Sequence, residues 1–180
     1  MGSNTKSTLH KIVILGTPRA GKTSLMVRLA KGSITDDIKS TRGIDFHVVQ
    51  SEPIAEGIKL QIWDLAGQSH YRDTGMFDDF VAGASGFIFC YDASDASSIR
   101  QVDNWIEVAK KHKRYSETKK YLVGLKADMV DQGQQTALHS LVDKYLDQTD
   151  IISKHFIVST HKEINIDGLI HEIIEDLQTL

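Results

Sequence analysis

The spacing of apolar and polar positions predicts short strands that alternate with helices along the chain. Runs rich in branched and aromatic residues, typical of buried strands, lie at 10–15, 86–91, 120–125 and 155–158. Helix-forming segments follow these runs at 22–31, 98–112, 136–146 and from 167 onward. Segments 44–50 and 58–63 alternate with period two on either side of a turn at Glu56 and Gly57, which predicts an antiparallel hairpin at a sheet edge.

This order of elements predicts an α/β fold with a mostly parallel six-stranded sheet, one antiparallel edge strand and helices on both faces. We expect a flexible segment over residues 1–9 and a single domain over residues 10–180, because no repeat, linker or low-complexity segment interrupts the chain. Ligands of such sheets bind at the carboxyl ends of the strands. The site should therefore include the loop after the first strand and the segments that follow Trp63, Leu125 and Val158.

A glycine-rich loop joins the first predicted strand to the first predicted helix. It spells G-x-x-x-x-G-K-T over residues 16–23 and is followed by Ser24. Backbone N–H groups of such a loop can point at a polyphosphate, and the helix N-terminus adds positive potential. Lys22 would reach the β- and γ-phosphates, and the Thr23 hydroxyl would bind Mg²⁺. A chance match is the alternative, and the correct strand and helix on either side argue against it.

A second cluster ends the strand at 58–63. The Asp64 carboxylate could hold Mg²⁺ directly or through water, or it could cap a following helix. The neighbouring phosphate loop favours the metal. Gly67 would let the backbone approach a γ-phosphate closely, and Gln68 could orient an attacking water.

Composition limits the binding partners and the cellular compartment that we expect for the protein. The net charge of −3 provides no general basic field for nucleic acid, and Cys90 is the single cysteine, so no disulfide can form within the chain. The single cysteine favours a reducing, cytoplasmic setting. We also expect a monomer. Because no apolar run is long enough to span a bilayer, we expect membrane association only as a peripheral protein, through an anchor or a partner outside these residues.

Five segments, in order, resemble the Ras superfamily of small GTPases, and the Rab branch in particular, over about residues 10–178. The first is the phosphate loop. Ser40–Phe46 is similar to the Rab pattern S-T-I-G-V-D-F, and Asp64–Gln68 resembles the second switch. Leu125–Asp128 corresponds to the family pattern N-K-x-D, which binds the base, and Ser159–His161 corresponds to the family pattern S-A-K. The resemblance implies a P-loop NTPase G domain, that is, a switch that binds GTP or GDP with Mg²⁺ and hydrolyses GTP slowly in membrane traffic or intracellular signalling.

The resemblance also implies roles for individual residues. Catalysis would involve Gln68, Lys22 and Thr41, and Mg²⁺ would be held by Thr23, Thr41 and Asp64. Asp128 would accept two hydrogen bonds from guanine, which adenine cannot offer. The full set of nucleotide-binding residues that it implies is Gly16, Thr17, Pro18, Arg19, Ala20, Gly21, Lys22, Thr23, Ser24, Ile34, Thr41, Gly67, Lys126, Asp128, Ser159, Thr160 and His161.

Several positions depart from the family pattern. Leu125 replaces an asparagine that contacts the base and ties this segment to the phosphate loop, and His161 replaces a lysine. Ile34 stands where many relatives place an aromatic side chain over the guanine edge. Pro18 has no N–H, and Arg19 replaces a small residue, so the catalytic face should be crowded. The departures at Leu125, His161 and Ile34 predict weaker or looser nucleotide selection.

They also leave two alternatives open. One is a nucleotide-bound scaffold, or pseudo-GTPase, with negligible hydrolysis. The other is a P-loop nucleotidase with altered base choice, against which Asp128 argues.

The resemblance further implies protein partners at the switch regions. These are an exchange factor, effectors and a GTPase-activating protein, which would supply an arginine finger because no residue here clearly serves as one. The effector-binding candidates are Arg42, Ile44, Phe46, Trp63 and Phe80. For the three aromatic residues, a place in the core is the alternative. The basic run 110–114 is interpreted as a solvated helix end, with contact to an anionic membrane as the alternative.

Overall fold

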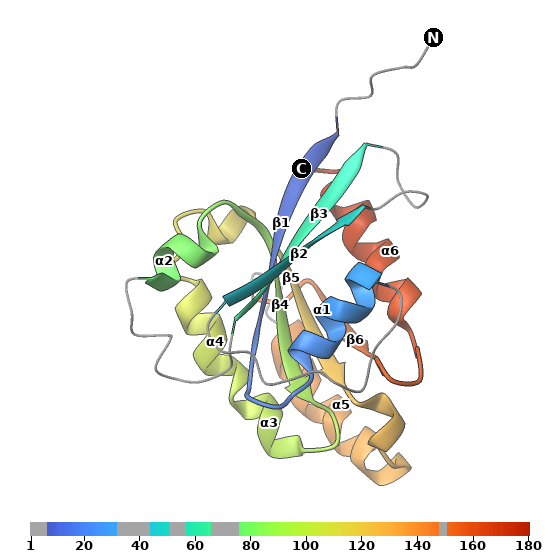
Figure 1. Ribbon diagram of the computed structural model, residues 1–180. Helices are drawn as coiled ribbons and strands as arrows, with labels where there is room; N and C mark the ends of the chain where they lie inside the picture. Colours follow the sequence, from blue (N-terminus) through green and yellow to red (C-terminus); the bar gives the residue numbers. More distant parts are fainter. Residues whose placement is uncertain (1–6, 32–43, 51–56, 66–75, 148–150) are drawn as a thin grey trace.

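The computed structural model describes residues 7–31, 44–50, 57–65, 76–147 and 151–180, with only the backbone described for 44–50, Lys31 and Met76. Six strands form one sheet in the order β2-β3-β1-β4-β5-β6 (Figure 1). Edge strand β2 pairs antiparallel with β3, and all other pairs are parallel, as predicted. The strands are β1 (Thr8–Gly16), β2 (Ile44–Gln50), β3 (Ile58–Leu65), β4 (Ala84–Asp92), β5 (Lys119–Leu125) and β6 (Lys154–Ile157).

Helices cover both faces of the sheet, which confirms the predicted layers (Figure 1). One core lies under α2, α3, α4 and α5, and the other lies under α1 and α6. The helices are α1 (Lys22–Lys31), α2 (Met76–Val81), α3 (Ala96–Arg100), α4 (Val102–Ala109), α5 (Gln132–Leu146) and α6 (Ile166–Leu177). None of the described helices is long and apolar enough to cross a lipid bilayer.

Central strand β4 explains the continuous apolar run in the sequence. Phe87, Phe89 and Tyr91 face the core under α2–α5, while Ile88 and Cys90 face the core under α1 and α6. Side chains of a strand alternate between the two faces, so a strand covered on both faces must be apolar at every position.

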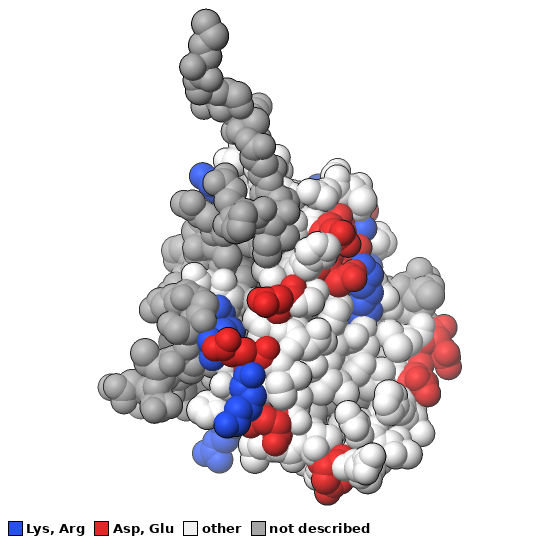
Figure 2. Space-filling model, turned by 90° about the vertical axis from the view of Figure 1, so that its right-hand side faces the viewer, with Lys and Arg blue, Asp and Glu red and all other residues white. Residues whose placement is uncertain are grey.

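Most charged side chains of the described residues reach the outside of these layers, and the buried exceptions are Lys22, Arg28, Asp64 and Lys120. On the face shown in Figure 2, basic and acidic groups lie close together in small clusters, and neither sign dominates. An ion-pair cluster joins β6 to α6, where Lys154 Nζ lies 2.5 Å from Glu172 Oε2 and 3.0 Å from Asp176 Oδ1.

Several predicted boundaries are wrong. Strand β1 begins at Thr8, inside the segment predicted to be flexible. The helix predicted over 98–112 is divided at Gln101 into α3 and α4 and ends at Ala109. Helix α5 begins at Gln132 rather than at residue 136, because Asp131 and Gln134 form a reciprocal capping box. The short helix α2 was not predicted at all.

Candidate functional site

The phosphate loop lies between the carboxyl end of β1 and the start of α1, at the lower edge of the sheet in Figure 1. Gly16 begins it with φ +147°, and a Cβ at this residue would lie 2.2 Å from the carbonyl oxygen of Cys90 on β4. Only glycine fits this approach, so the loop rests directly against the neighbouring strand.

Lys22 is nearly buried at the start of α1, and its Nζ donates to the carbonyl oxygen of Thr17, 2.8 Å away. Burial lowers the pKa of this ammonium, and the nearby Asp64 carboxylate opposes the shift. The lysine therefore places a cationic group across the loop, as a phosphate contact requires.

The predicted metal ligands Thr23 and Asp64 meet in the structure. The Thr23 hydroxyl on α1 donates to Oδ2 of Asp64, although the two residues are 41 positions apart. Asp64 is fully buried within β3, so the alternative role as a helix cap does not apply. A hydroxyl and a carboxylate oxygen at the phosphate loop are the donor types that Mg²⁺ prefers. The residues present therefore fit this ion.

The two predicted base-binding segments also come together. Oγ of the fully buried Ser159 donates to Oδ1 of Asp128, 2.5 Å away, and the backbone N–H of Ala127 donates to the carbonyl oxygen of Val158, 3.0 Å away. Lys126 has left-handed backbone geometry (φ +65°), and its Nζ lies 2.5 Å from Oδ2 of Asp92 at the end of β4. The Asp128 carboxylate is thus held at an exposed position where a base could reach it.

Leu125 makes an apolar contact in place of the polar one that an asparagine would make. Its side chain is 1% exposed, and its Cδ1 lies 3.5 Å from the point where a Cβ of Gly21 would stand. The base-binding segment therefore packs against the phosphate loop through carbon atoms. This packing is consistent with the predicted loss of the asparagine's hydrogen bonds.

Other loop residues differ in exposure. Pro18 and Arg19 are exposed, and Arg19 has φ +62°, a left-handed conformation that costs a non-glycine residue about 1–2 kcal/mol. His161 is also exposed, whereas Ala20 is buried and Ser24 is half-buried.

Sequence reasoning missed Arg28. This residue of α1 is 8% exposed, and its Nε donates to the carbonyl oxygen of Thr160, 2.9 Å away. Its Nη1 lies 2.6 Å from Oε1 of Glu163. The guanidinium thus fixes the segment after β6. Nothing in the sequence around Arg28 indicates this contact, because Thr160 lies 132 positions further along the chain.

Several predicted site residues lie outside the described part of the chain, namely Ile34, Thr41, Arg42, Gly67 and Gln68. Ile44 and Phe46 lie on β2, where only the backbone is described. Their roles stay predictions.

Of the two places that the sequence left open for Phe80, the structure shows the one in the core. Its side chain is 2% exposed and belongs to the core under α2–α5, because it packs edge-on against Trp63 at 5.7 Å between ring centres. Trp63 itself is half-buried, and Nζ of Lys11 lies 3.9 Å from its ring centre. Lys11 was not predicted to take part, and it places a cation on the tryptophan face.

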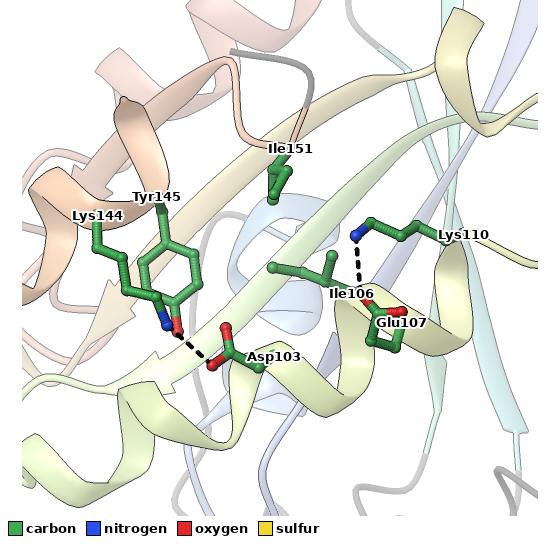
Figure 3. Close-up of a pocket in the computed structure, with 7 residues that line it drawn as sticks. All are labelled: Asp103, Ile106, Glu107, Lys110, Lys144, Tyr145 and Ile151. Carbon is green, nitrogen blue, oxygen red and sulfur yellow. Dashed lines mark hydrogen bonds and ion pairs between the residues drawn. The ribbon is translucent and has the colours of Figure 1, made fainter. Parts of the chain in front are cut away.

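A separate pocket lies between α4 and α5, with a volume of about 220 Å³ (Figure 3). Its lining residues are Asp103, Ile106, Glu107, Lys110, Lys144, Tyr145 and Ile151. The four charges pair with one another, with Lys110 2.7 Å from Glu107 and Lys144 3.2 Å from Asp103. None of these lining residues belongs to the phosphate loop or to the base-binding segments, so the pocket is not part of the candidate site.

Comparison with known proteins agrees with this geometry. Residues 11–179 match the model of the Ras family. The chain is 33% identical to the Ras-related protein RAB1BV of Beta vulgaris over 170 residues, which cover 94% of this chain and 76% of that protein. It is 30% identical to the Ras-related protein Rab-13 of Mesocricetus auratus over 169 residues, 94% of this chain and 80% of the relative. It is 32% identical to the GTP-binding protein ypt1 of Schizosaccharomyces pombe over 143 residues, 79% and 68% of the two chains. The chain therefore belongs to the Ras family, as a small GTPase similar to the Rab and Ypt proteins.

Proposed function

We propose that this protein is a guanine-nucleotide switch of membrane traffic, which binds GTP or GDP with Mg²⁺ and hydrolyses GTP slowly. The observation that carries the proposal is the meeting of two predicted half-sites at one edge of the sheet. Lys22 and the Thr23–Asp64 pair form the phosphate half, and the Asp128–Ser159 pair forms the base half. A nucleotide needs both halves.

The base half supports a preference for guanine. An ionised carboxylate only accepts hydrogen bonds, and guanine offers a ring N–H and an exocyclic NH₂ side by side. Ser159 restrains one oxygen of Asp128 and so orients the carboxylate. Adenine would leave this acceptor without its donors, which is costly in a bound complex.

The phosphate half supports hydrolysis. The Lys22 ammonium would stabilise negative charge on the β- and γ-phosphate oxygens. Mg²⁺ held by Thr23 and Asp64, with Thr41 by family resemblance, would neutralise further charge on those oxygens. By the same resemblance Gln68 positions the attacking water. We expect turnover of roughly 10⁻⁴ to 10⁻² s⁻¹ without help, and faster turnover when a GTPase-activating protein supplies an arginine. Exchange factors and effectors would bind at the switch regions, at a membrane surface.

Base choice gives the first test. Wild-type protein should bind GTP and GDP much more tightly than ATP and ADP in a competition titration. Asp128→Ala should erase this preference, and Asp128→Asn should shift it toward xanthine nucleotides. Asp143→Ala, on the exposed face of α5, is the matched control and should behave like wild type. Equal affinity of the wild type for GTP and ATP would contradict the proposal.

Turnover separates a working switch from a nucleotide-bound scaffold. Phosphate release should be measurable in a single-turnover assay with GTP-loaded protein, and Gln68→Leu should slow it. The exposed Pro18 and the left-handed Arg19 beside the γ-phosphate position are the features that favour a scaffold. If wild-type protein stays loaded with GTP for many hours and releases no phosphate, the scaffold replaces the enzyme.

A further inference from the structure

We propose that Ser98 of α3 is a positioning residue that joins the phosphate loop to the base-binding segment. It does so through Thr17 on one side and through Asp92 and Lys126 on the other. This inference rests on the proposed function, because it concerns how the two halves of one nucleotide site are held in register. Ser98 was not among the site residues that the sequence indicated.

The first link joins α3 to the phosphate loop. Oγ of Ser98 and Oγ1 of Thr17 lie 3.2 Å apart, and both side chains are almost fully buried, at 3% and 5% exposure. Buried hydroxyls need partners, so each fixes the position of the other. The carbonyl oxygen of Thr17 is the group to which Lys22 donates, 2.8 Å away. Thr17 therefore connects Ser98 to the phosphate-binding lysine.

The second link joins α3 to the end of β4. The backbone N–H of Asp92 donates to Oγ of Ser98 at 2.8 Å. A serine hydroxyl carries one proton and two lone pairs, so it can accept from Asp92 and still bond to Thr17. Ser98 thus holds two backbone segments at once, one from the phosphate loop and one from the central strand.

The third link reaches the base-binding segment. Oδ2 of Asp92 lies 2.5 Å from Nζ of Lys126. Its Oδ1 accepts from the backbone N–H and the hydroxyl of Ser94, at 3.0 and 2.6 Å, so the carboxylate cannot swing freely. Because the carboxylate is restrained, the position of Lys126 follows the position of Asp92.

Leu125 makes this path important. Its contact with the loop at Gly21 is apolar, and an apolar contact resists separation but fixes no direction. The bonds through Ser98 are directional and mostly buried, and such bonds specify one arrangement. In this chain the path through α3 therefore supplies the orientation that an asparagine in place of Leu125 would give directly.

The test measures how fast a fluorescently labelled GDP leaves the Mg²⁺-loaded protein. Ser98→Ala should accelerate dissociation about tenfold, because a buried partner of both segments is lost. Thr17→Val keeps the branched shape but removes the hydroxyl, and it should have a similar effect. Thr17→Ser keeps the hydroxyl and should accelerate dissociation clearly less than Thr17→Val does. The matched control is Ser97→Ala, which changes the exposed serine directly before Ser98 on α3. This variant should release GDP at the wild-type rate.

The double variant Thr17→Val with Ser98→Ala should be no faster than Ser98→Ala alone, because Ser98→Ala already removes the bond to Thr17. All rates are taken at a temperature where urea denaturation shows every variant to be folded, so a lower midpoint alone cannot produce the result. Multiplied effects in the double variant, or a wild-type rate for Ser98→Ala, would overturn this inference while leaving the proposed function intact. A wild-type protein that binds neither GDP nor GTP would overturn the proposed function, and the inference with it.

Discussion

Replacing Gly124 with alanine should disturb three strands at once. The Tyr91 side chain of β4 crosses β5 and meets His155 of β6, with 2.9 Å between Tyr91 Oη and His155 Nε2. The two rings are nearly parallel, 6.1 Å apart at 15°. The crossing is possible because Gly124, which pairs with Tyr91 in the sheet, has no side chain. A Cβ at Gly124 would lie 2.6 Å from Tyr91 Oη and 2.7 Å from its Cζ.

The size of the effect follows from what must move. Tyr91 is fully buried, so its ring can yield only by displacing core neighbours, and overpacking of this kind costs about 1–3 kcal/mol. Displacement would also break the hydrogen bond to His155 and leave a buried hydroxyl unpaired, at about 1–3 kcal/mol. Alanine reduces the entropy of the unfolded chain, which returns about 0.4–1 kcal/mol. We therefore expect the free energy of unfolding to fall by about 1–5 kcal/mol.

Urea denaturation at neutral pH measures this loss, with an unchanged slope indicating that the unfolded state is not affected. Gly133→Ala is the control. Gly133 lies in the first turn of α5, where the nearest atom to a new Cβ is Asp131 Oδ1 at 3.4 Å, so this variant should be neutral or slightly more stable. Adding Tyr91→Phe to Gly124→Ala should cost less than the sum of the single changes, because it removes the closest clash. An unchanged urea midpoint for Gly124→Ala would refute the reasoning.

Two other predictions concern buried ionisable groups. Burial lowers the pKa of His155 from 6.5 to about 4, so the unfolded chain takes up this proton first as the pH falls. The contribution of neutral His155 to the free energy of unfolding is complete above pH 6.5 and should decline by up to about 3 kcal/mol toward pH 4. Urea titrations at each pH should show a smaller decline for His155→Gln than for the wild type. Equal declines in both proteins would contradict this prediction. Arg28→Met should lower the free energy of unfolding by about 1–3 kcal/mol, because the carbonyl oxygen of Thr160 loses its buried donor. Glu163→Gln should change it by less than about 1 kcal/mol, because this carboxylate is 67% exposed, and equal losses would show that the ion pair rather than the carbonyl contact matters.

Much of the fold could be predicted because the spacing of apolar residues within a short segment indicates whether that segment is a strand or a helix. The alternation of Phe87 and Ile88 between two cores makes β4 apolar throughout, and period two marks β3. The start of α5 could not be found from periodicity, since its first turn is polar and contains Gly133. The pattern Asp131-x-x-Gln134 was the available signal, and it was missed.

The site divides in the same way. The phosphate loop and Asp64 could be predicted, because a short sequence carries the chemistry that each of them needs. The contacts of Arg28 with Thr160 and of Ser98 with Thr17 could not, because they join residues 132 and 81 positions apart. Such contacts depend on how the loops pack at the edge of the sheet, and no local pattern records that packing. For Phe80 the sequence left both a core position and a docking surface open for a related reason, since an aromatic residue fits the two equally well.

The place of Cys90 gives the protein a built-in reporter. It is the single cysteine of the chain, it is fully buried, and its carbonyl oxygen touches Gly16 at the start of the phosphate loop. Burial raises the pKa of its thiol, so the folded protein offers almost no thiolate to an alkylating reagent. This sulfur can therefore be labelled only when the sheet opens locally beneath the loop. The labelling rate, followed by mass spectrometry on unmodified protein, would time that opening, and a bound ligand that clamps the loop would be read directly as slower labelling.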